Sequence, residues 1–362
     1  MILHLLSNRW NSAITEYALQ SIQALDTEYQ QYFFCLANKP AHSRAIELEI
    51  PTIPLKNFIP TINSILTLKN FQKHDPVIIT YGGPEEILAQ LCGFRKIFRF
   101  IGERKKYNRF SRLSHYQTTA LICPSDIIKN EIISNKVHHN VHTIPLGLPI
   151  PCNHENNRYQ NPTILIFGRF DPIKGHREFI KILKIAYSIG LNPDCKLRII
   201  GNSANLAPQN IMDYARSEGL EDSIEIIEKR VSNKDQIMSE TTLGIVCSLG
   251  SEIICRVAQE FLLNGCPVFL SNAGSLPEVL IEENFGSCFD FNNPTEAARL
   301  LIALVTNSMQ EDVNIRKKRR QASENYFALN AFKNNWISTL KIYDPATTGS
   351  NVEDLVDLPS SL

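Results

Sequence analysis

Two cations lie between an apolar run and a helical pattern in the segment FGRFDPIKGHREF (167–179). Gly168 ends the apolar run and Gly175 precedes the helix. Arg169 and Lys174 lie between the two glycines. Each cation just before a helix is opposed by the positive end of the helix dipole, by about 0.3–1 kcal/mol. An anion offsets that cost, and a forked guanidinium beside an ammonium suits a diphosphate. Two surface charges on a solvated turn are the alternative.

Two glutamates, Glu252 and Glu260, occur in the segment SEIICRVAQEFLLNGCPV (251–268). On one helix their separation of eight positions would place them about 12 Å apart, with Glu252 at or before the helix start. The paired carboxylates of glycosidases are roughly 5–9.5 Å apart, so a hydrolytic pair is disfavoured. Carboxylates this far apart can bind separate hydroxyl-bearing parts of one extended ligand. The alternatives are a first-turn acid for Glu252 and a surface residue for Glu260.

A third junction has the sequence SNAGSLPEVL (271–280). Ser275 and Glu278 fit a capping box, and Pro277 is early in the expected helix. Capping alone explains these three residues, and direct contact with a ligand is the alternative. Gly274 would allow the backbone to approach a ligand closely.

Short apolar runs alternate with amphipathic segments from end to end. The runs predicted as strands are 2–6, 32–36, 76–80, 96–101, 120–123 and 141–144, then 163–167, 196–200, 224–227, 244–247 and 267–270. In the second half each run is followed by a helical pattern, at 174–188, 208–219, 233–240, 256–264 and 277–283. Continuous apolar strands that alternate with helices predict parallel sheets covered on both faces.

The alternation is interrupted once, at 146–162, which is rich in Pro, Asn and Gly and is interpreted as an interdomain linker. We therefore predict an α/β protein with two Rossmann-like, doubly wound parallel-sheet domains facing each other across a cleft. The first comprises residues 1–150 and the second residues 151–328. A helix over 329–343 is expected to return toward the first domain. Residues 344–362 are rich in Gly, Ser and Asp and are expected to form a flexible tail.

The composition excludes several classes of protein. The 362 residues include 37 Lys+Arg and 37 Asp+Glu, a balance that argues against wholesale nucleic-acid binding. Nine scattered cysteines without a CxxC pair argue against a disulfide scaffold or a zinc ribbon and favour a reducing compartment. The start does not resemble a signal peptide, and no stretch approaches the roughly 20 apolar residues that span a bilayer. We expect a cytoplasmic protein, at most peripheral on the inner face of the cytoplasmic membrane.

Taken in order, the three junctions resemble the fingerprint of the family 4 retaining glycosyltransferases, which have the GT-B fold. That fingerprint is a Gly-Arg…Lys-Gly turn, a Ser-Glu…Glu-Ala…Gly-x-Pro-Val segment and a Gly-x-Pro-Glu turn. This chain has FGRFDPIKGH, SEIICRVAQEFLLNGCPV and NAGSLPEVL in the same order. The resemblance covers about residues 115–290. The chain departs from the family in its glycine-poor first loop, SNRWNSAITEY, and at Phe261, where the family has alanine.

The resemblance implies a role for each matching residue. Arg169 and Lys174 would hold the donor diphosphate and neutralise the leaving group. Glu252 would contact the donor sugar, and Glu260 would bind the ribose hydroxyls. The full set implied to bind the donor is Gly168, Arg169, Lys174, Glu252, Glu260, Gly274 and Ser275. The family retains the anomeric configuration and usually needs no metal, and no DxD motif is placed to bind one. No cofactor is therefore expected beyond the donor substrate, for which a UDP-sugar is the expectation.

The segment FRKIFRFIGERKKYNRFSRLSHY (94–116) is strongly basic. Its cations are Arg95, Lys96, Arg99, Arg104, Lys105, Lys106, Arg109 and Arg112, and its aromatic residues are Phe94, Phe98, Phe100, Tyr107 and Phe110. Residues 94–112 could meet an anionic membrane surface, or an acidic or phosphorylated glycan. A half-buried strand followed by a solvated helix is the alternative. Glu103, expected to face the cleft, is the candidate for activating the acceptor hydroxyl. By analogy with family members that have basic first domains, the acceptor would be a glycan or a lipid-linked glycan in lipopolysaccharide or surface polysaccharide synthesis.

Other functions remain open at this stage. A nucleotide-sugar epimerase would bind a similar donor but would need a buried acid and base and no second substrate. A catalytically degenerate donor-binding protein is favoured by the glycine-poor first loop, and opposed by the intact Arg169, Lys174, Glu252 and Glu260. A periplasmic binding protein shares the two-domain outline, but the absent export signal argues against it. His138, His139 and His142 are interpreted as polar residues at a strand edge rather than as a metal site.

Overall fold

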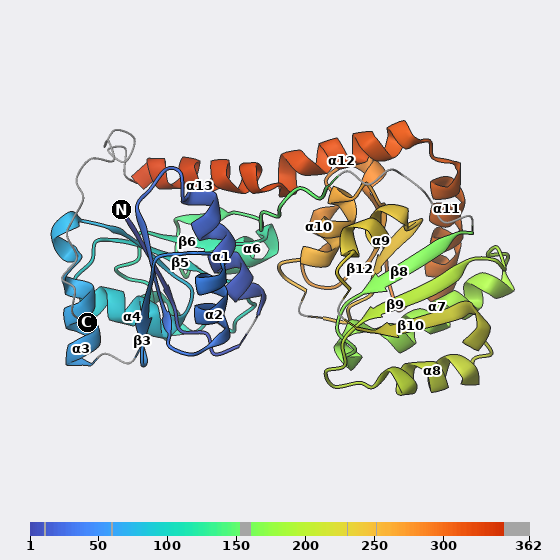
Figure 1. The fold of residues 1–362 in the computed structure, drawn as a ribbon, viewed down its shortest axis with the longest axis horizontal. Helices are drawn as coiled ribbons and strands as arrows, with labels where there is room; N and C mark the ends of the chain where they lie inside the picture. The colour runs from blue at the N-terminus through green and yellow to red at the C-terminus, as the bar shows by residue number, and fades with distance from the viewer. Residues whose placement is uncertain (11, 59–60, 153–160, 230, 251, 344–362) are drawn as a thin grey trace.

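Two parallel sheets, one in each half of the chain, form the framework of the protein (Figure 1). The computed structural model describes residues 1–343 except 11, 59–60, 153–160, 230 and 251. Part of the expected linker and all of the expected tail therefore lie outside the described residues.

The first sheet has seven parallel strands in the order β3-β2-β1-β4-β5-β6-β7. Their bounds are β1 Ile2–Leu6, β2 Gln31–Leu36, β3 Thr52–Leu55, β4 Val77–Thr80, β5 Lys96–Phe100, β6 Ala120–Cys123 and β7 Val141–Thr143. The helices between them are α1 Ala13–Leu25, α2 Pro40–Glu47, α3 Ile62–Lys69, α4 Gly83–Leu91, α5 Arg109–Ser114 and α6 Asp126–Ser134, with a 3₁₀ turn η1 Gln72–His74. The central strands are fully buried, as their continuous apolar sequences predict.

The second sheet has six parallel strands in the order β10-β9-β8-β11-β12-β13. Their bounds are β8 Thr163–Phe167, β9 Lys196–Gly201, β10 Ile224–Glu228, β11 Leu243–Val246, β12 Val268–Ser271 and β13 Gly286–Phe289. The helices of this half are α7 His176–Ser188, α8 Pro208–Ser217, α9 Lys234–Glu240, α10 Arg256–Leu263, α11 Pro294–Gln310 and α12 Val313–Phe327. Short 3₁₀ turns are η2 Pro172–Lys174, η3 Glu221–Ser223, η4 Leu276–Val279 and η5 Glu283–Phe285. The strand order reverses between β8 and β11, the switch point where open α/β sheets bind ligands.

The last helix, α13 Leu329–Tyr343, leaves the second domain and packs against α1 of the first domain (Figure 1). The chain therefore passes between the domains twice, once before β8 and once at the junction of α12 and α13. At this point the amide of Leu148 donates to the carbonyl of Phe327 at 2.8 Å, and the amide of Leu329 donates to the carbonyl of Leu148 at 2.9 Å. The two chain segments that connect the domains are thus held side by side by backbone hydrogen bonds.

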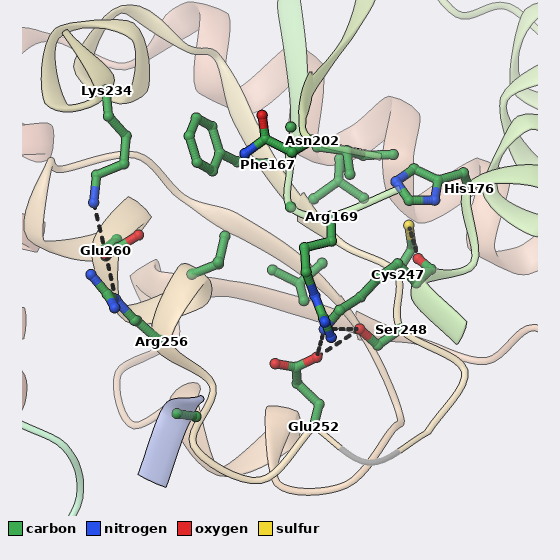
Figure 2. Close-up of a pocket in the computed structure, with 18 of the residues that line it drawn as sticks. Phe167, Arg169, His176, Asn202, Lys234, Cys247, Ser248, Glu252, Arg256 and Glu260 are labelled. Atoms are coloured by element: carbon green, nitrogen blue, oxygen red, sulfur yellow. Dashed lines mark hydrogen bonds and ion pairs between the residues drawn. The ribbon is translucent and has the colours of Figure 1, made fainter. Parts of the chain in front are cut away.

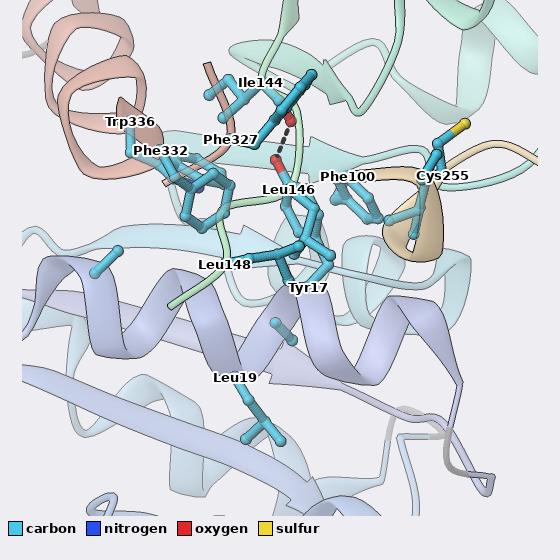
Figure 3. Packing of buried hydrophobic residues seen from close by; sticks show 14 of the residues in the cluster. Tyr17, Leu19, Phe100, Ile144, Leu146, Leu148, Cys255, Phe327, Phe332 and Trp336 are labelled. Atoms are coloured by element: carbon cyan, nitrogen blue, oxygen red, sulfur yellow. Dashed lines mark hydrogen bonds between the residues drawn. The ribbon is translucent and has the colours of Figure 1, made fainter. Parts of the chain in front are cut away.

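An apolar cluster fixes α13 to the first domain (Figure 3). The ring of Tyr17 stacks on Phe100 with centroids 3.8 Å apart and meets Phe332 and Trp336 edge-on. The hydroxyl of Tyr17 donates to the carbonyl of Ile144 at 2.8 Å, so this buried polar group is satisfied. The first domain's core is completed by a helix that follows the second domain in sequence.

The doubly wound α/β architecture agrees with the prediction, and eleven of the thirteen described strands lie on predicted runs. The prediction missed β3 and β13. β3 is a four-residue edge strand that contains Pro54, and most of β13 is only half-buried. Edge strands need no continuous apolar sequence, because water covers part of their surface. The helix expected over 277–283 is wrong, since only the 3₁₀ turn η4 and the first residue of η5 lie there.

Candidate functional site

A cavity of about 560 Å³ opens between the domains at the carboxyl ends of β8, β9 and β11. The second domain supplies most of its wall, and the first domain contributes Ser12, Ala13 and Glu16 from the start of α1. Five of the seven residues expected to bind a donor line it: Gly168, Arg169, Lys174, Glu252 and Glu260. The cavity coincides with the switch point of the second sheet, where helix N-termini and strand ends converge.

The turn after β8 is shaped so that Lys174 reaches the cavity. The carboxylate of Asp171 accepts the amide of Ile173 at 3.1 Å, which closes η2, and that hydrogen bond is the main cause of the lowered pKa of Asp171. Gly175 follows with φ of +70°, and a Cβ there would lie 2.0 Å from the carbonyl oxygen of Cys247. Only glycine allows this turn to pack against the end of β11.

Lys174 and Glu252 form an ion pair on one wall of the cavity (Figure 2 labels Glu252 and Ser248). The Nζ of Lys174 lies 2.5 Å from Oε2 of Glu252, and the hydroxyl of Ser248 donates to the same oxygen at 2.7 Å. Glu252 lies four residues before the first residue of α10, so the two glutamates are not on one helix. Arg169 is exposed and makes no hydrogen bond or ion pair with the described residues, so its guanidinium is free to meet a ligand.

Glu260 belongs to a chain of four charges that crosses the cleft. Its Oε1 accepts from Nζ of Lys234 at 2.8 Å and from Nε of Arg256 at 2.9 Å. Arg256 also lies 3.4 Å from the carboxylate of Glu16 on α1. Glu260 is therefore oriented by two cations, and one of them is linked to the opposite domain.

The N-terminus of α7 borders the cavity through His176, which is 1% exposed. Burial lowers the pKa of His176 to about 4, so the imidazole is neutral at pH 7. The N-cap residue of α7, Gly175, has no side chain to bind the first amides of the helix. Such amides and the helix dipole favour an anionic ligand at this place.

Gly274 and Ser275, the other two residues expected to bind the donor, are not among the residues that line the cavity. They lie behind Glu252, because the amide of Ser275 donates to the carbonyl of Glu252 at 2.7 Å. The predicted capping box is wrong. The side chain of Ser275 makes no capping hydrogen bond, and the carboxylate of Glu278 instead accepts the amides of Asp126 and Ile127 in the first domain.

The expectation that Glu103 faces the cleft is not met. Its side chain is 66% exposed, lies 4.0 Å from Lys105 and is absent from the cavity wall. The basic segment divides into two parts. Phe94, Phe98, Phe100 and Arg99 are buried in and around β5, whereas Arg95, Arg104, Lys105, Lys106 and Arg112 are exposed. The side chains of Arg109 and Phe110 lie outside what the structure describes.

His138 and His139 stack on each other, and His142 bonds to the hydroxyl of Tyr343 at 2.8 Å. Among the described residues, no group of three or more His, Cys, Asp or Glu is arranged to hold a metal ion. No helix in the described part of the chain is long and apolar enough to cross a membrane.

Comparisons with known proteins give one family and several similar folds. Residues 153–326 match the model of the family described as glycosyl transferases group 1, just under half of the chain. A glycosyltransferase from Rickettsia africae superposes with a TM-score of 0.79 at 14% identity, covering 94% of this chain and 97% of that one. Anabaena Alr3699/HepE, solved in complex with UDP, gives a TM-score of 0.75 at 16% identity, with 94% and 99% covered. No curated protein sequence matches this chain.

This chain has the GT-B fold. A third structure, the apo form of the lipopolysaccharide outer core galactosyltransferase WaaB, agrees with a TM-score of 0.73 at 13% identity over 95% of this chain and 100% of that one. The structural similarity covers 94% of this chain and so includes both domains, whereas the family model matches only residues 153–326.

Sequence reasoning missed six charged or polar residues on the cavity wall: Glu16, His176, Asn202, Lys234, Ser248 and Arg256. Lys234 opens α9 and Arg256 opens α10, each just after a loop that follows a strand. That position is the signal that could have identified them, since strand-to-helix junctions of a parallel sheet share one edge. No local signal links Glu16 to Arg256, which is far away in the sequence.

Proposed function

We propose that this protein is a retaining glycosyltransferase that moves a sugar from a nucleoside-diphosphate sugar to a glycan or lipid-linked acceptor without a metal ion. The observation that carries the proposal is the interdomain cavity, which has Arg169 and Lys174 beside the N-terminus of α7. Its two glutamates are Glu252, paired with Lys174, and Glu260, paired with Lys234 and Arg256. A diphosphate fits the cationic part of this wall. The two separated carboxylates suit the hydroxyl groups of a sugar and a ribose.

The residues of this chain would act mainly by binding and electrostatics. When the bond between the sugar C1 and the diphosphate oxygen breaks, negative charge grows on the nucleoside diphosphate. Arg169 and Lys174 would stabilise that charge in a partly enclosed site, and such stabilisation is often the largest contribution to catalysis. Glu252 would orient the donor sugar while the acceptor hydroxyl attacks C1 from the side of the first domain. The proton of that hydroxyl would pass to the departing diphosphate oxygen. The retaining stereochemistry rests on the resemblance to family 4.

The donor is proposed to be a UDP-sugar. Two of the similar structures support this choice, because HepE is described in complex with UDP and with UDP-glucose. WaaB, a lipopolysaccharide galactosyltransferase by name, supports a hexose as the transferred group and a surface glycan as the acceptor class.

The decisive experiment is a calorimetric titration of UDP, GDP and ADP, and of their sugars, without added metal. Micromolar binding of one nucleotide, reduced at least tenfold by Arg169→Ala combined with Lys174→Ala, supports the donor site. Lys184→Ala combined with Arg216→Ala is the matched control, since both residues are exposed and lie outside the cavity. No binding of any nucleotide by the wild-type protein would refute the proposal. Glycosyl transfer is then followed by NMR, which also reports the anomeric configuration of the product.

The rival functions give different results in the same assays. An epimerase would convert a nucleotide-sugar in the absence of an acceptor, without releasing the nucleotide. A degenerate donor-binding protein would bind a nucleotide but neither transfer nor hydrolyse the sugar. The ion pairs that orient Glu252 and Glu260 favour transfer over a degenerate site, because a site that has lost its activity has no need of them.

The exposed part of the basic segment is proposed to meet an anionic membrane surface. Arg95, Arg104, Lys105, Lys106 and Arg112 are exposed there, and Leu113 and Tyr116 are 68% and 83% exposed. Basic residues near an anionic surface contribute up to about 1 kcal/mol each, and exposed apolar side chains can insert into the interface. Sedimentation with phosphatidylglycerol vesicles and with phosphatidylcholine vesicles tests this. Equal binding to both, or no loss of binding on Lys105→Glu with Lys106→Glu, would contradict it.

A further inference from the structure

Glu278 makes a contact that no local pattern requires. It lies in η4 of the second domain, and its two carboxylate oxygens accept the amides of Asp126 and Ile127 at 2.7 and 2.6 Å. These are the first two residues of α6 in the first domain. The first amides of a helix have no partner within the helix and carry a partial positive charge. A carboxylate from one domain therefore caps a helix of the other.

The N-cap residue of α6 itself does not compete for this position. Ser125 is the N-cap residue of α6, but its side chain makes no capping hydrogen bond, and its buried hydroxyl has no partner. A serine at an N-cap ordinarily binds one of these amides itself. Here the side-chain cap that the described residues provide for the first two amides of α6 comes from across the domain interface.

A second contact holds the body of the same helix. Ile253 of the second domain is 7% exposed and belongs to an apolar cluster of the first domain that contains Ile128 and Ile132 of α6. Its neighbours Ile254 and Cys255 are buried in the cluster that includes Phe100 (Figure 3 labels Cys255 and Phe100). The three residues that follow Glu252 in the chain therefore pack against the first domain.

The hydrogen bonds of Glu278 to α6 and the apolar contacts of residues 253–255 are connected through the backbone of Glu252. Its carbonyl accepts the amide of Ser275, three residues before Glu278, at 2.7 Å. Gly274 has φ of +54°, and a Cβ there would lie 2.1 Å from the same carbonyl oxygen. The two loops are therefore in close contact and are expected to move together. The side chain of Glu252 meanwhile faces Lys174 in the cavity.

We propose that Glu278 is a positioning residue: by capping α6 across the domain interface, it holds the closed arrangement in which Glu252 is placed against the donor. The effect on transfer rests on the proposed function, whereas the effect on domain closure does not. All the residues expected to hold the nucleotide itself belong to the second domain, so nucleotide affinity depends little on closure. Transfer needs both domains, because closure completes the site and excludes water.

The test compares Glu278→Ala and Glu278→Gln with Glu283→Gln, an exposed acid five residues further along that lies outside the interface contacts described above. Small-angle scattering without ligand measures the open population, calorimetry measures UDP affinity, and steady-state kinetics measures transfer. For Glu278→Ala we expect a larger maximum dimension, kcat lower by about tenfold or more, and a UDP Kd changed less than about threefold. Glu278→Gln keeps one acceptor oxygen and should lie between the alanine variant and the wild type.

Other outcomes refute the proposal. A scattering profile of Glu278→Ala identical to that of the wild type shows that the cap does not hold the domains closed. A loss of UDP affinity in proportion to kcat shows that Glu278 acts through the donor site or the stability of the second domain. Failure of the proposed function looks different, since the wild type then binds no UDP while the scattering of the variants still reports on closure. If Glu278→Ala does not fold, Glu278→Gln carries the same comparison.

Discussion

At the scale of single residues, the cavity is arranged by backbone features as much as by charges. Lys174 reaches Glu252 because Gly175 lets the preceding turn pack on the end of β11. Glu252 is held from behind by the loop of Gly274. Replacement of either glycine would therefore disturb the proposed donor site without removing any charge.

Gly274→Ala is expected to abolish transfer while the protein stays folded. The added Cβ would lie 2.1 Å from the carbonyl oxygen of Glu252, and φ of +54° adds a strain of about 1–2 kcal/mol for a non-glycine residue. Gly219→Ala is the matched control, because Gly219 has φ of +73° and open space where a Cβ would stand. Thermal unfolding measures the backbone strain that both variants share. Steady-state kinetics measures the loss of transfer, which is expected only where Glu252 is displaced. Equal losses of activity in the two variants would contradict this prediction.

Buried His4 in β1 gives the first domain a pH-dependent stability. Burial lowers its pKa from 6.5 to about 4, while its ring nitrogens lie 2.9 Å from the hydroxyl of Tyr81 and 2.8 Å from Oε1 of Gln31. Below pH 6.5 the unfolded chain binds a proton that the folded domain does not bind, so the free energy of unfolding falls as the pH falls toward 4. Between pH 7 and pH 5 the loss from His4 is about 2 kcal/mol.

Urea unfolding at the two pH values measures this effect. His4→Gln should lose less stability than the wild type between pH 7 and pH 5, by about 2 kcal/mol. His74→Gln, at an exposed position, should behave as the wild type. An unchanged pH dependence in His4→Gln would show that other groups cause the acid sensitivity.

At the scale of elements, long and strongly patterned segments were predictable and local motifs were less so. The buried strands β1, β4, β6, β8 and β11 were readable because their sequences are almost wholly apolar. The pattern Ser275…Glu278 looked like a capping box, but its glutamate caps α6 instead, 151 residues earlier in the chain at Ile127. A short pattern specifies which bonds a side chain can make, and tertiary packing decides which of them it makes.

The helix α13 is expected to be essential for the stability of the first domain. Trp336 is fully buried and contacts Tyr17 and Phe332 edge-on, so Trp336→Ala should lower the free energy of unfolding by about 3–5 kcal/mol. Ile342→Ala, on the same helix but 62% exposed, should change it by less than about 0.5 kcal/mol. Urea unfolding followed by circular dichroism measures both. Similar losses in the two variants would mean that α13 does not dock as the structure shows.

At the scale of the whole molecule, the cavity wall of the second domain is joined to the first domain by the charges of Glu16, Arg256, Glu260 and Lys234. The link could not be predicted from the sequence, because Glu16 is on α1 and the other three residues belong to the second domain. Its position in the cavity means that a ligand bound to Glu260 changes the environment of Arg256, the residue that also contacts the opposite domain. Nucleotide binding and domain closure are thus expected to influence each other only weakly, within the less than threefold change in UDP affinity expected for Glu278→Ala.

A double-mutant cycle with Glu16→Gln and Arg256→Gln measures how strongly this ion pair favours the closed arrangement of the domains. The side chain of Arg256 is 41% exposed, so water and salt screen the pair. The coupling energy between the two residues should therefore be about 0.2–1 kcal/mol. Fluorescence energy transfer between labelled domains reports the closed fraction with and without UDP, and each single variant should lower that fraction by up to about fivefold. The coupling should shrink in 1 M salt, where the Debye length is about 3 Å. If the effects of the two substitutions simply add at low salt, the pair does not hold the domains together, and closure depends on the contacts around α6 instead.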